Sequence, residues 1–251
     1  MSFLEQRNLL FTSPPCPTTR KALEDSEVLK FLLNSVAFKN FSTIAKAEGV
    51  GENSCHLSED EVLDLLVELE LWEAPEYIQE QFPYQFGGYD SQNRPIWMGH
   101  LGSCQLRQFI DRQEEYLLEK YGLQAGYKVI KSIVAKTVEE NSSRSAVLIA
   151  NSDGLSLFQF MYPPTLAFLL KLARVYKDIY AEVLGTGILV NANYVARFGI
   201  NILRPILGQT LNKIEVYGHD EKTWRQRLRE VFTIEIIPSF TGNNHDLCQF
   251  E

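Results

Sequence analysis

The sequence predicts an α/β fold with a mostly parallel sheet, preceded by a small helical part. The first observation is that short apolar runs alternate with helical patterns from residue 145 onward. The second is that residues 146–149 and 187–190 are apolar runs and residues 214–217 are a largely apolar one, each with the length of a strand, which is typical of βαβ units. The third is that the patterns recognised in the first eighty residues are helical, at 28–36 and from residue 58 to residue 75. We therefore expect a helical subdomain over 1–80 and an α/β domain over 81–251.

The N-terminal part begins with a proline-rich segment at residues 12–19, which is not expected to be helical. Apolar residues at helical spacing over 28–36 predict a first helix. Ser58 and Glu61 form the pattern of a capping box, which predicts that a second helix begins there. Pro75 is expected to end that helix.

The central part of the chain mixes turn formers, strands and long helical patterns. Residues 85–95 are dense in turn-forming residues and lead directly into a predicted strand at 96–98. Helices are expected over roughly 105–121 and 125–140 from the spacing of apolar residues. A further helix is predicted to begin at Pro163.

Charge and composition exclude several classes of function. The chain has 251 residues and a net charge of −8, which argues against nucleic acid as a partner and against simple electrostatic adhesion to anionic membranes. No C-x-x-C pair, no N-terminal signal pattern and no run of apolar residues long enough to span a bilayer is found. We expect a cytoplasmic protein whose membrane contact, if any, is local, transient and apolar.

The search for catalytic chemistry finds little. The sequence contains no G-x-S-x-G elbow, no Walker loop and no G-x-G-x-x-G after a strand. Its four histidines have no metal-ligand spacing with cysteine or aspartate. We therefore expect a protein that is not an enzyme and that uses neither a metal nor a cofactor.

The predicted helix at residues 193–207 is unusually apolar. Arg197, Asn201 and Arg204 form one narrow polar stripe, and the rest of the circumference is almost entirely apolar. Such a helix is either a core helix or the cover of an apolar site that opens to lipid. Two buried, unpaired arginines would be costly in a core.

Five short motifs, in order from residue 89 to residue 242, resemble the CRAL-TRIO domain family of phosphatidylinositol/phosphatidylcholine transfer proteins and tocopherol- or retinal-binding proteins. They are similar to the family's D-x-x-G-R-P-V, D-x-x-G-L-S, I-N-A-P, T-x-x-K-I-x-V-x-G and L-P-x-x-F-G-G patterns, at Tyr89–Ile96, Ile149–Ser156, Val190–Asn193, Thr210–Gly218 and Pro238–Gly242. Asn151, Asn193 and Asn243 depart from the usual residues, which indicates a divergent member.

The resemblance implies a parallel sheet that floors a hydrophobic cavity, and a bound lipid. It also implies that residues 193–207 form a gate helix, which swings to admit lipid at a membrane. The gate positions would be Tyr194, Val195, Phe198, Ile202, Leu203 and Ile206.

The resemblance also indicates which residues would contact a lipid headgroup. Glu182 and Lys213 correspond to the glutamate and lysine that contact inositol phosphate in one branch of the family, while Ser35 and Val36 replace its basic pair. Ser156 keeps the small hydroxyl of the choline-lipid branch, and Phe158 replaces a second hydroxyl. A neutral ligand such as a tocopherol, retinoid, sterol, carotenoid or fatty acyl lipid fits these changes at least as well as a phospholipid.

Two functions remain open from the sequence. The first is a lipid carrier that exchanges or presents one hydrophobic ligand at membranes through the gate helix. The second is a regulatory or scaffold module that binds a protein partner, in which the lipid is structural or absent.

Overall fold

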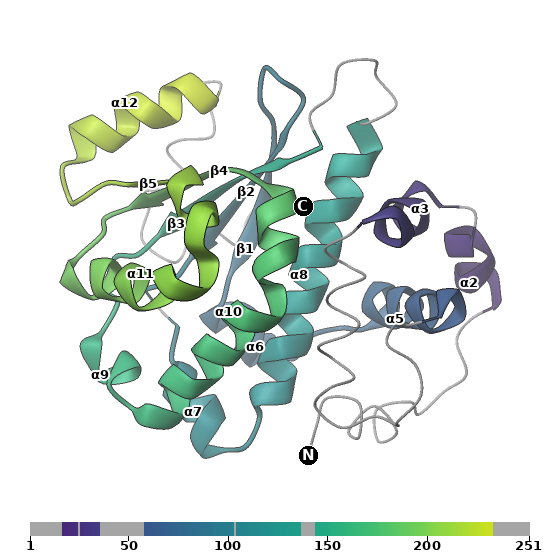
Figure 1. The fold of residues 1–251 in the computed structure, drawn as a ribbon, viewed down its shortest axis with the longest axis horizontal. Helices are drawn as coiled ribbons and strands as arrows, with labels where there is room; N and C mark the ends of the chain where they lie inside the picture. Colours follow the sequence, from purple (N-terminus) through teal and green to yellow (C-terminus); the bar gives the residue numbers. More distant parts are fainter. Residues whose placement is uncertain (1–16, 25, 36–57, 103, 137–143, 233–251) are drawn as a thin grey trace.

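The computed structural model describes residues 17–24, 26–35, 58–102, 104–136 and 144–232. It has one sheet with helices on both faces, and a group of N-terminal helices beside it (Figure 1). The predicted motif Pro238–Gly242, together with Val36 and Asn243, lies outside the described residues.

The sheet has five strands in the order β1-β2-β3-β4-β5. β1 is antiparallel to β2, and the remaining pairs are parallel. This confirms the predicted α/β fold with a mostly parallel sheet. The strands are Tyr84–Tyr89, Pro95–His100, Ala146–Asn151, Leu184–Val190 and Ile214–Val216.

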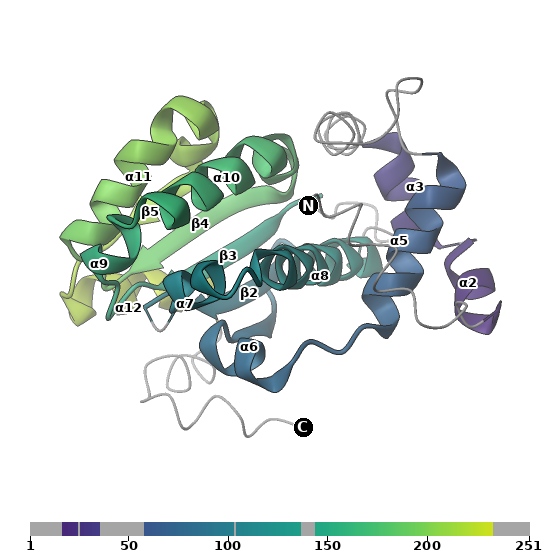
Figure 2. The ribbon, with the colours of Figure 1, turned by 90° about the horizontal axis from the view of Figure 1, so that it is seen from below.

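Helices connect each parallel strand to its neighbour. Since consecutive strands are adjacent and such crossovers are right-handed, these helices are expected on one face of the sheet. Figure 2 shows α10 and α11 on that face and α12 on the opposite face. The connecting helices and the helix after β5 are α7 (Leu106–Asp111), α8 (Glu115–Lys136), α9 (Leu157–Phe160), α10 (Pro163–Val183), α11 (Tyr194–Leu207), the short 3₁₀ helix η1 (Gly208–Lys213) and α12 (Glu221–Val231).

Alternate residues of the strands supply two different cores, because successive side chains point to opposite faces. Ile96, Val147 and Ile188 pack against Trp224 and Leu228 of α12. On the other face, Trp97 and Leu148 pack against a second cluster, which includes residues of α3, α5, α8 and α10. The site described below lies on this second face.

The N-terminal helices are α2 (Pro17–Glu24), α3 (Glu27–Asn34), α5 (Glu59–Leu71) and α6 (Glu76–Gln81). The predicted capping box is confirmed: the Ser58 hydroxyl accepts a hydrogen bond from the Glu61 amide, and the Glu61 carboxylate accepts one from the Ser58 amide. The expectation that residues 12–19 are not helical is wrong for Pro17–Thr19, because α2 begins at Pro17. Proline is tolerated at the first position, where its missing N–H has no helical partner.

One face of α8 fixes α5 in place. The Lys120 ammonium is 2.6 Å from the Glu68 carboxylate, and both side chains are buried. The Gln124 amide donates to two backbone carbonyls at the end of α5, at 3.0 and 2.6 Å. The Tyr127 hydroxyl donates to Glu70 at 2.6 Å. Three residues spaced by about one helical turn therefore hold the N-terminal helices against the sheet domain. The boundary proposed at residue 80 stays a prediction.

Two expectations for the central part need correction. Residues 84–89 form strand β1 rather than a turn, and the turn is confined to Asp90–Arg94, where the Asp90 carboxylate accepts from the Arg94 amide at 2.9 Å. The predicted helices at 105–121 and 125–140 are divided elsewhere: the break lies between α7 and α8, where Gln113 has a φ of 58°. The spacing of apolar residues in the sequence did not predict α6, α9 or α12.

Candidate functional site

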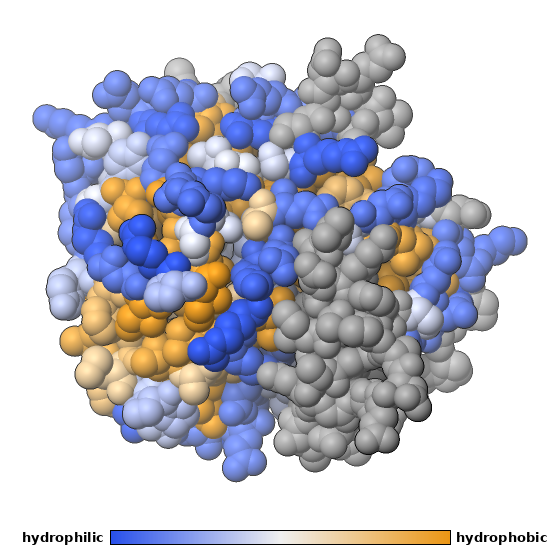
Figure 3. Space-filling view, in the orientation of Figure 1, coloured by the Kyte–Doolittle hydropathy of each residue, from blue (hydrophilic) through white to orange (hydrophobic). Residues whose placement is uncertain are grey.

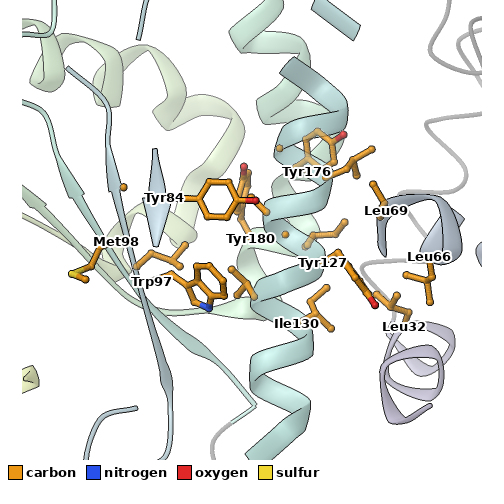
Figure 4. A pocket seen from close by; sticks show the side chains of 18 of the residues that line it. Leu32, Leu66, Leu69, Tyr84, Trp97, Met98, Tyr127, Ile130, Tyr176 and Tyr180 are labelled. Atoms are coloured by element: carbon orange, nitrogen blue, oxygen red, sulfur yellow. The ribbon is translucent and has the colours of Figure 1, made fainter. Parts of the chain in front are cut away.

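A cavity of about 350 Å³ lies between α8, α10 and the sheet, and α3 and α5 wall its far side (Figure 4). The described residues that line it are apolar or aromatic, or are glycines, and include no charged side chain. They are Leu32, Leu65, Leu66, Leu69, Tyr84, Trp97, Met98, Gly99, Gly122, Leu123, Ala125, Gly126, Tyr127, Val129, Ile130, Leu148, Ile149, Tyr176, Ile179 and Tyr180. A volume near the lower end of the roughly 300–1,000 Å³ of small-molecule sites indicates a ligand of moderate size.

The sheet forms an apolar floor for this cavity. Trp97 and Leu148 come from β2 and β3, which pair in register as Trp97↔Leu148. The indole N–H of Trp97 donates to the Ser132 hydroxyl of α8 at 2.9 Å. That bond satisfies the polar atom of the indole, so the ring can line an apolar space without leaving a buried donor unpaired.

Two glycines of α8 widen the cavity. Gly122 and Gly126 lie one turn apart on this helix, with Ala125 beside them, and all three line the cavity. A Cβ built on either glycine meets no described atom within 4 Å, and neither has a positive φ. Glycine costs a helix about 1 kcal/mol relative to alanine. No turn or close backbone contact requires these glycines, and their effect is to leave space.

Tyrosines supply the polar groups of the cavity wall. The Tyr127 hydroxyl is engaged by Glu70. The buried hydroxyl of Tyr84 has no hydrogen-bond partner among the described residues, and burial raises its pKa to about 12. Burial also raises the pKa of Tyr176 and of Tyr180, and the Tyr180 side chain is nevertheless 45% exposed. The raised pKa and the exposed fraction of Tyr180 both fit a ring whose accessible face points into the cavity. These hydroxyls stay neutral at physiological pH.

The structure brings two of the predicted headgroup positions together. The Ser35 hydroxyl, at the end of α3, donates to the Glu182 carboxylate of α10 at 2.7 Å. Lys213 donates to the backbone carbonyls of Ala181 and Leu184, which lie on either side of Glu182 in the chain, at 2.8 and 2.7 Å. Cations at the end of a helix stabilise its last carbonyls in this way. Neither Glu182 nor Lys213 lines the cavity, and a ligand role for them stays a prediction.

Ser156 and Phe158 also lie away from the cavity wall. The Ser156 hydroxyl caps α9 by accepting from the Phe158 amide at 3.3 Å. The Phe158 ring is 64% exposed, and the Arg107 guanidinium lies 4.5 Å from its centroid. Their predicted headgroup contacts stay predictions.

The predicted gate helix is α11, which the Asn193 side chain caps by accepting from the Ala196 amide at 3.0 Å. Its polar stripe, Arg197, Asn201 and Arg204, is exposed, so the helix is not a fully buried core helix. The six predicted gate positions do not line the described cavity; they range from buried Val195 to Tyr194, which is 72% exposed. Movement of this helix stays a prediction.

A patch of exposed apolar side chains lies on α9 and the start of α11, which pack against each other. Figure 3 shows apolar residues gathering over this region and the adjoining α10. We call it the α9–α11 surface and define it by the exposed residues Leu157, Phe158, Met161 and Tyr194.

Sequence reasoning did not identify the cavity residues Tyr84, Gly122 and Gly126. One signal was present for the glycines: they are spaced by four residues inside a helical pattern, and glycines in a helix interior require a packing or functional reason. Tyr84 had no comparable signal, because its role depends on the antiparallel pairing of β1 with β2.

A family model of the CRAL/TRIO domain matches residues 79–242. The chain belongs to the CRAL/TRIO domain family. This confirms the resemblance of the ordered motifs, and the matched range contains the whole sheet together with α8, α10 and α11.

Two curated relatives show the extent of the similarity. A CRAL-TRIO domain-containing protein of Caenorhabditis elegans is 23% identical over 234 residues, which is 89% of this chain and 30% of the relative. The phosphatidylinositol/phosphatidylcholine transfer protein SFH9 of Arabidopsis thaliana is 23% identical over 189 residues, which is 72% of this chain and 31% of the relative. The chain thus spans less than a third of either relative.

The crystal structure of Sfh5 superimposes with a TM-score of 0.45 and 12% identity, over 77% of this chain and 81% of that one. Among the described residues, no cluster of potential metal ligands is found, and no helix is long and apolar enough to cross a membrane.

Proposed function

We propose that this CRAL/TRIO chain binds the apolar body of one lipid molecule in the cavity and carries or presents it at membranes, without a chemical step. The cavity, held open by Gly122 and Gly126, is the observation that carries the proposal. Burial of apolar surface contributes about 25 cal/mol per Å², so a ligand in an apolar cavity gains most of its affinity from its hydrocarbon. The Arabidopsis relative is named as a phosphatidylinositol/phosphatidylcholine transfer protein, which supports the same class of activity.

The binding step is tested by mass spectrometry of organic extracts from gently purified protein. We expect a lipid to co-purify in about equimolar amount with the wild type. In the variant Gly126→Leu the new side chain projects into the cavity, so the extracted lipid should fall to background while the far-UV circular dichroism spectrum stays unchanged. A lipid yield equal to that of the wild type would show that the cavity is not the binding site.

The membrane step is proposed to use the α9–α11 surface. Exposed aromatic and apolar side chains enter the headgroup region of a bilayer readily, and the exposed Arg197 and Arg204 of the same helix can contact lipid phosphates. We propose that α11 also acts as the gate.

Vesicle-to-vesicle transfer tests this step. Tyr194→Asp removes an exposed ring, and Phe198→Asp changes a half-buried one. Both should reduce transfer strongly while the purified protein keeps its ligand. Asn201→Asp is the matched control, since it adds the same charge to the polar stripe of α11. If all three variants transfer as well as the wild type, α11 takes no part in transfer.

The alternative is a regulatory or scaffold module in which the α9–α11 surface binds a protein. An exposed apolar patch is equally typical of a protein interface, which is the observation that favours this alternative. In this alternative the lipid is structural or absent. Where it is absent, no lipid co-purifies and no lipid raises the melting temperature, because a ligand that binds the folded state must stabilise it.

A further inference from the structure

The chemistry of the cavity wall restricts the class of ligand more narrowly than membership of the family does. Phosphate binding in a buried site requires cationic partners or several donors. The described wall has none of the five charged residue types, and its Tyr127 hydroxyl is engaged by Glu70 at 2.6 Å. Burial, and then the nearby Glu119 carboxylate, raise the pKa of Tyr176.

Two cations among the described residues lie close to the wall, and one of them, the Lys131 ammonium, is 5.7 Å from the centroid of the Tyr127 ring and is paired with Glu70 at 2.7 Å. The other, the Lys128 ammonium, is 5.2 Å from the centroid of the Tyr84 ring. Lys128 is exposed, however, and does not line the cavity. Burial of its ammonium lowers its pKa, although the Glu70 charge opposes this change. Lys128 therefore packs against the aromatic wall from outside instead of offering its charge to the interior.

The charged residues that could have formed a headgroup site are engaged elsewhere. Glu182 accepts from Ser35, and Lys213 donates to two carbonyls at the end of α10. Both interactions fix the position of α10 within the protein. A phosphate at this end of α10 would have to compete with them.

Two hydroxyls remain for a ligand. The buried Tyr84 hydroxyl has no partner among the described residues, and a buried unpaired polar group destabilises a protein. Tyr180 is 45% exposed and forms a ring contact with Tyr176, with centroids 6.4 Å apart. Figure 4 shows Tyr84 of β1 and Tyr180 of α10 among the side chains that line the cavity. A neutral hydroxyl can donate to or accept from an uncharged polar group.

We infer that the cavity takes an uncharged lipid, with an apolar body of moderate size and one hydroxyl or carbonyl group that hydrogen-bonds to Tyr84 or Tyr180, and that it excludes phosphate-bearing lipids. This inference rests on the proposed function, since it names the ligand class of the same cavity. It assigns to the two tyrosines the polar recognition that the sequence resemblance assigned to Glu182 and Lys213.

Displacement of Nile red, an uncharged fluorescent dye, from the full chain tests the inference. Three competitors share one chain length and differ in one group: dodecane, dodecan-1-ol and dodecyl phosphate. We expect dodecan-1-ol to displace the dye at a concentration about three- to tenfold lower than dodecane, which corresponds to one neutral hydrogen bond. Dodecyl phosphate should require a concentration about tenfold or more above that of the alcohol, because its charge is buried without a partner.

Variants that each remove one tyrosine hydroxyl identify the group that hydrogen-bonds to the ligand. Tyr84→Phe or Tyr180→Phe should remove the preference for the alcohol over the alkane and leave displacement by dodecane unchanged. Tyr89→Phe is the matched control, because Tyr89 lies on the same strand, its hydroxyl donates to the Ser132 carbonyl at 3.0 Å, and it does not line the cavity. An unchanged preference in both cavity variants would overturn the role of the tyrosines.

The outcomes separate the inference from the proposed function. If dodecyl phosphate displaces the dye as well as the alcohol does, the inference is wrong and lipid binding stands. If Nile red binds equally to the wild type and to Gly126→Leu, and no competitor displaces it, the proposed function itself fails and the inference fails with it.

Discussion

Replacement of the two cavity glycines by alanine should make this protein more stable. Gly122 and Gly126 are interior residues of α8, where glycine is less favourable than alanine by about 0.8–1.0 kcal/mol. The added methyl groups would meet no described atom within 4 Å, so neither a clash nor backbone strain offsets this gain. Each substitution should therefore raise the free energy of unfolding by about 1 kcal/mol, and the double variant by about 2 kcal/mol.

The gain is measurable by thermal and urea unfolding followed by circular dichroism. For a chain of this length, 1 kcal/mol corresponds to a rise in Tm of about 2–4 °C. The matched control is Gly187→Ala in β4, where a new Cβ would lie 3.0 Å from the Ile214 side chain. That variant should be less stable than the wild type, so the comparison separates a glycine that is required by packing from two that are not.

The same substitutions should weaken ligand binding, because each methyl group occupies part of the cavity. Stability measured without ligand and affinity for ligand are thus expected to move in opposite directions. If Gly122→Ala and Gly126→Ala lower the free energy of unfolding, then these glycines are required for the packing of α8. In that case they give no reason to regard the cavity as a ligand site.

Three further predictions concern other groups at the cavity and on α8. Lys120→Ala leaves the buried Glu68 carboxylate without its 2.6 Å partner and should lower the free energy of unfolding by about 3–5 kcal/mol, measured by urea titration. For Glu70, burial alone would raise the pKa, but hydrogen bonds from Lys131 and Tyr127 outweigh it and lower the pKa below its usual value. The resulting stabilisation is present above the unfolded-state pKa and is lost as the pH falls through the folded-state pKa. The wild type should therefore lose stability more steeply than Glu70→Gln between about pH 5 and pH 3. Equal slopes of stability against pH in the two proteins would contradict this prediction. Tyr84→Phe removes a buried hydroxyl that has no described partner and should raise the ligand-free stability by about 1 kcal/mol, whereas a loss of stability would show that the hydroxyl is satisfied within the protein.

Local signals in the sequence were enough to predict much of the fold. Ser58 and Glu61 identified the start of α5 because a capping box needs only residues three positions apart. Pro163 identified the start of α10 for a similar reason, since proline is suited to the first helical turn. The runs at 146–149 and 187–190 identified parallel strands because buried strands are continuously apolar.

Local signals failed where a contact between distant segments decided the structure. β1 was expected to be a turn because its glycines resemble turn residues, yet pairing with β2 makes it a strand. One helix was predicted to end near residue 121, just before Gly122, and α8 nevertheless continues through this glycine, held to α5 by Lys120 and Gln124 on either side. Long-range packing overrides propensity in such cases.

The sequence by itself determined the family, the positions of the parallel strands along the chain and the apolar character of α11, because each depends on residues that are near one another in the chain. Only the tertiary structure decided where the cavity lies and what lines it. Leu66 of α5, Trp97 of β2, Gly126 of α8 and Tyr180 of α10 line one space although they are far apart in sequence. The structure also decided that Glu182 bonds to Ser35 and that Lys213 caps α10. A charged residue can be recognised in a sequence, but the partner that engages its charge is known only once the chain is folded.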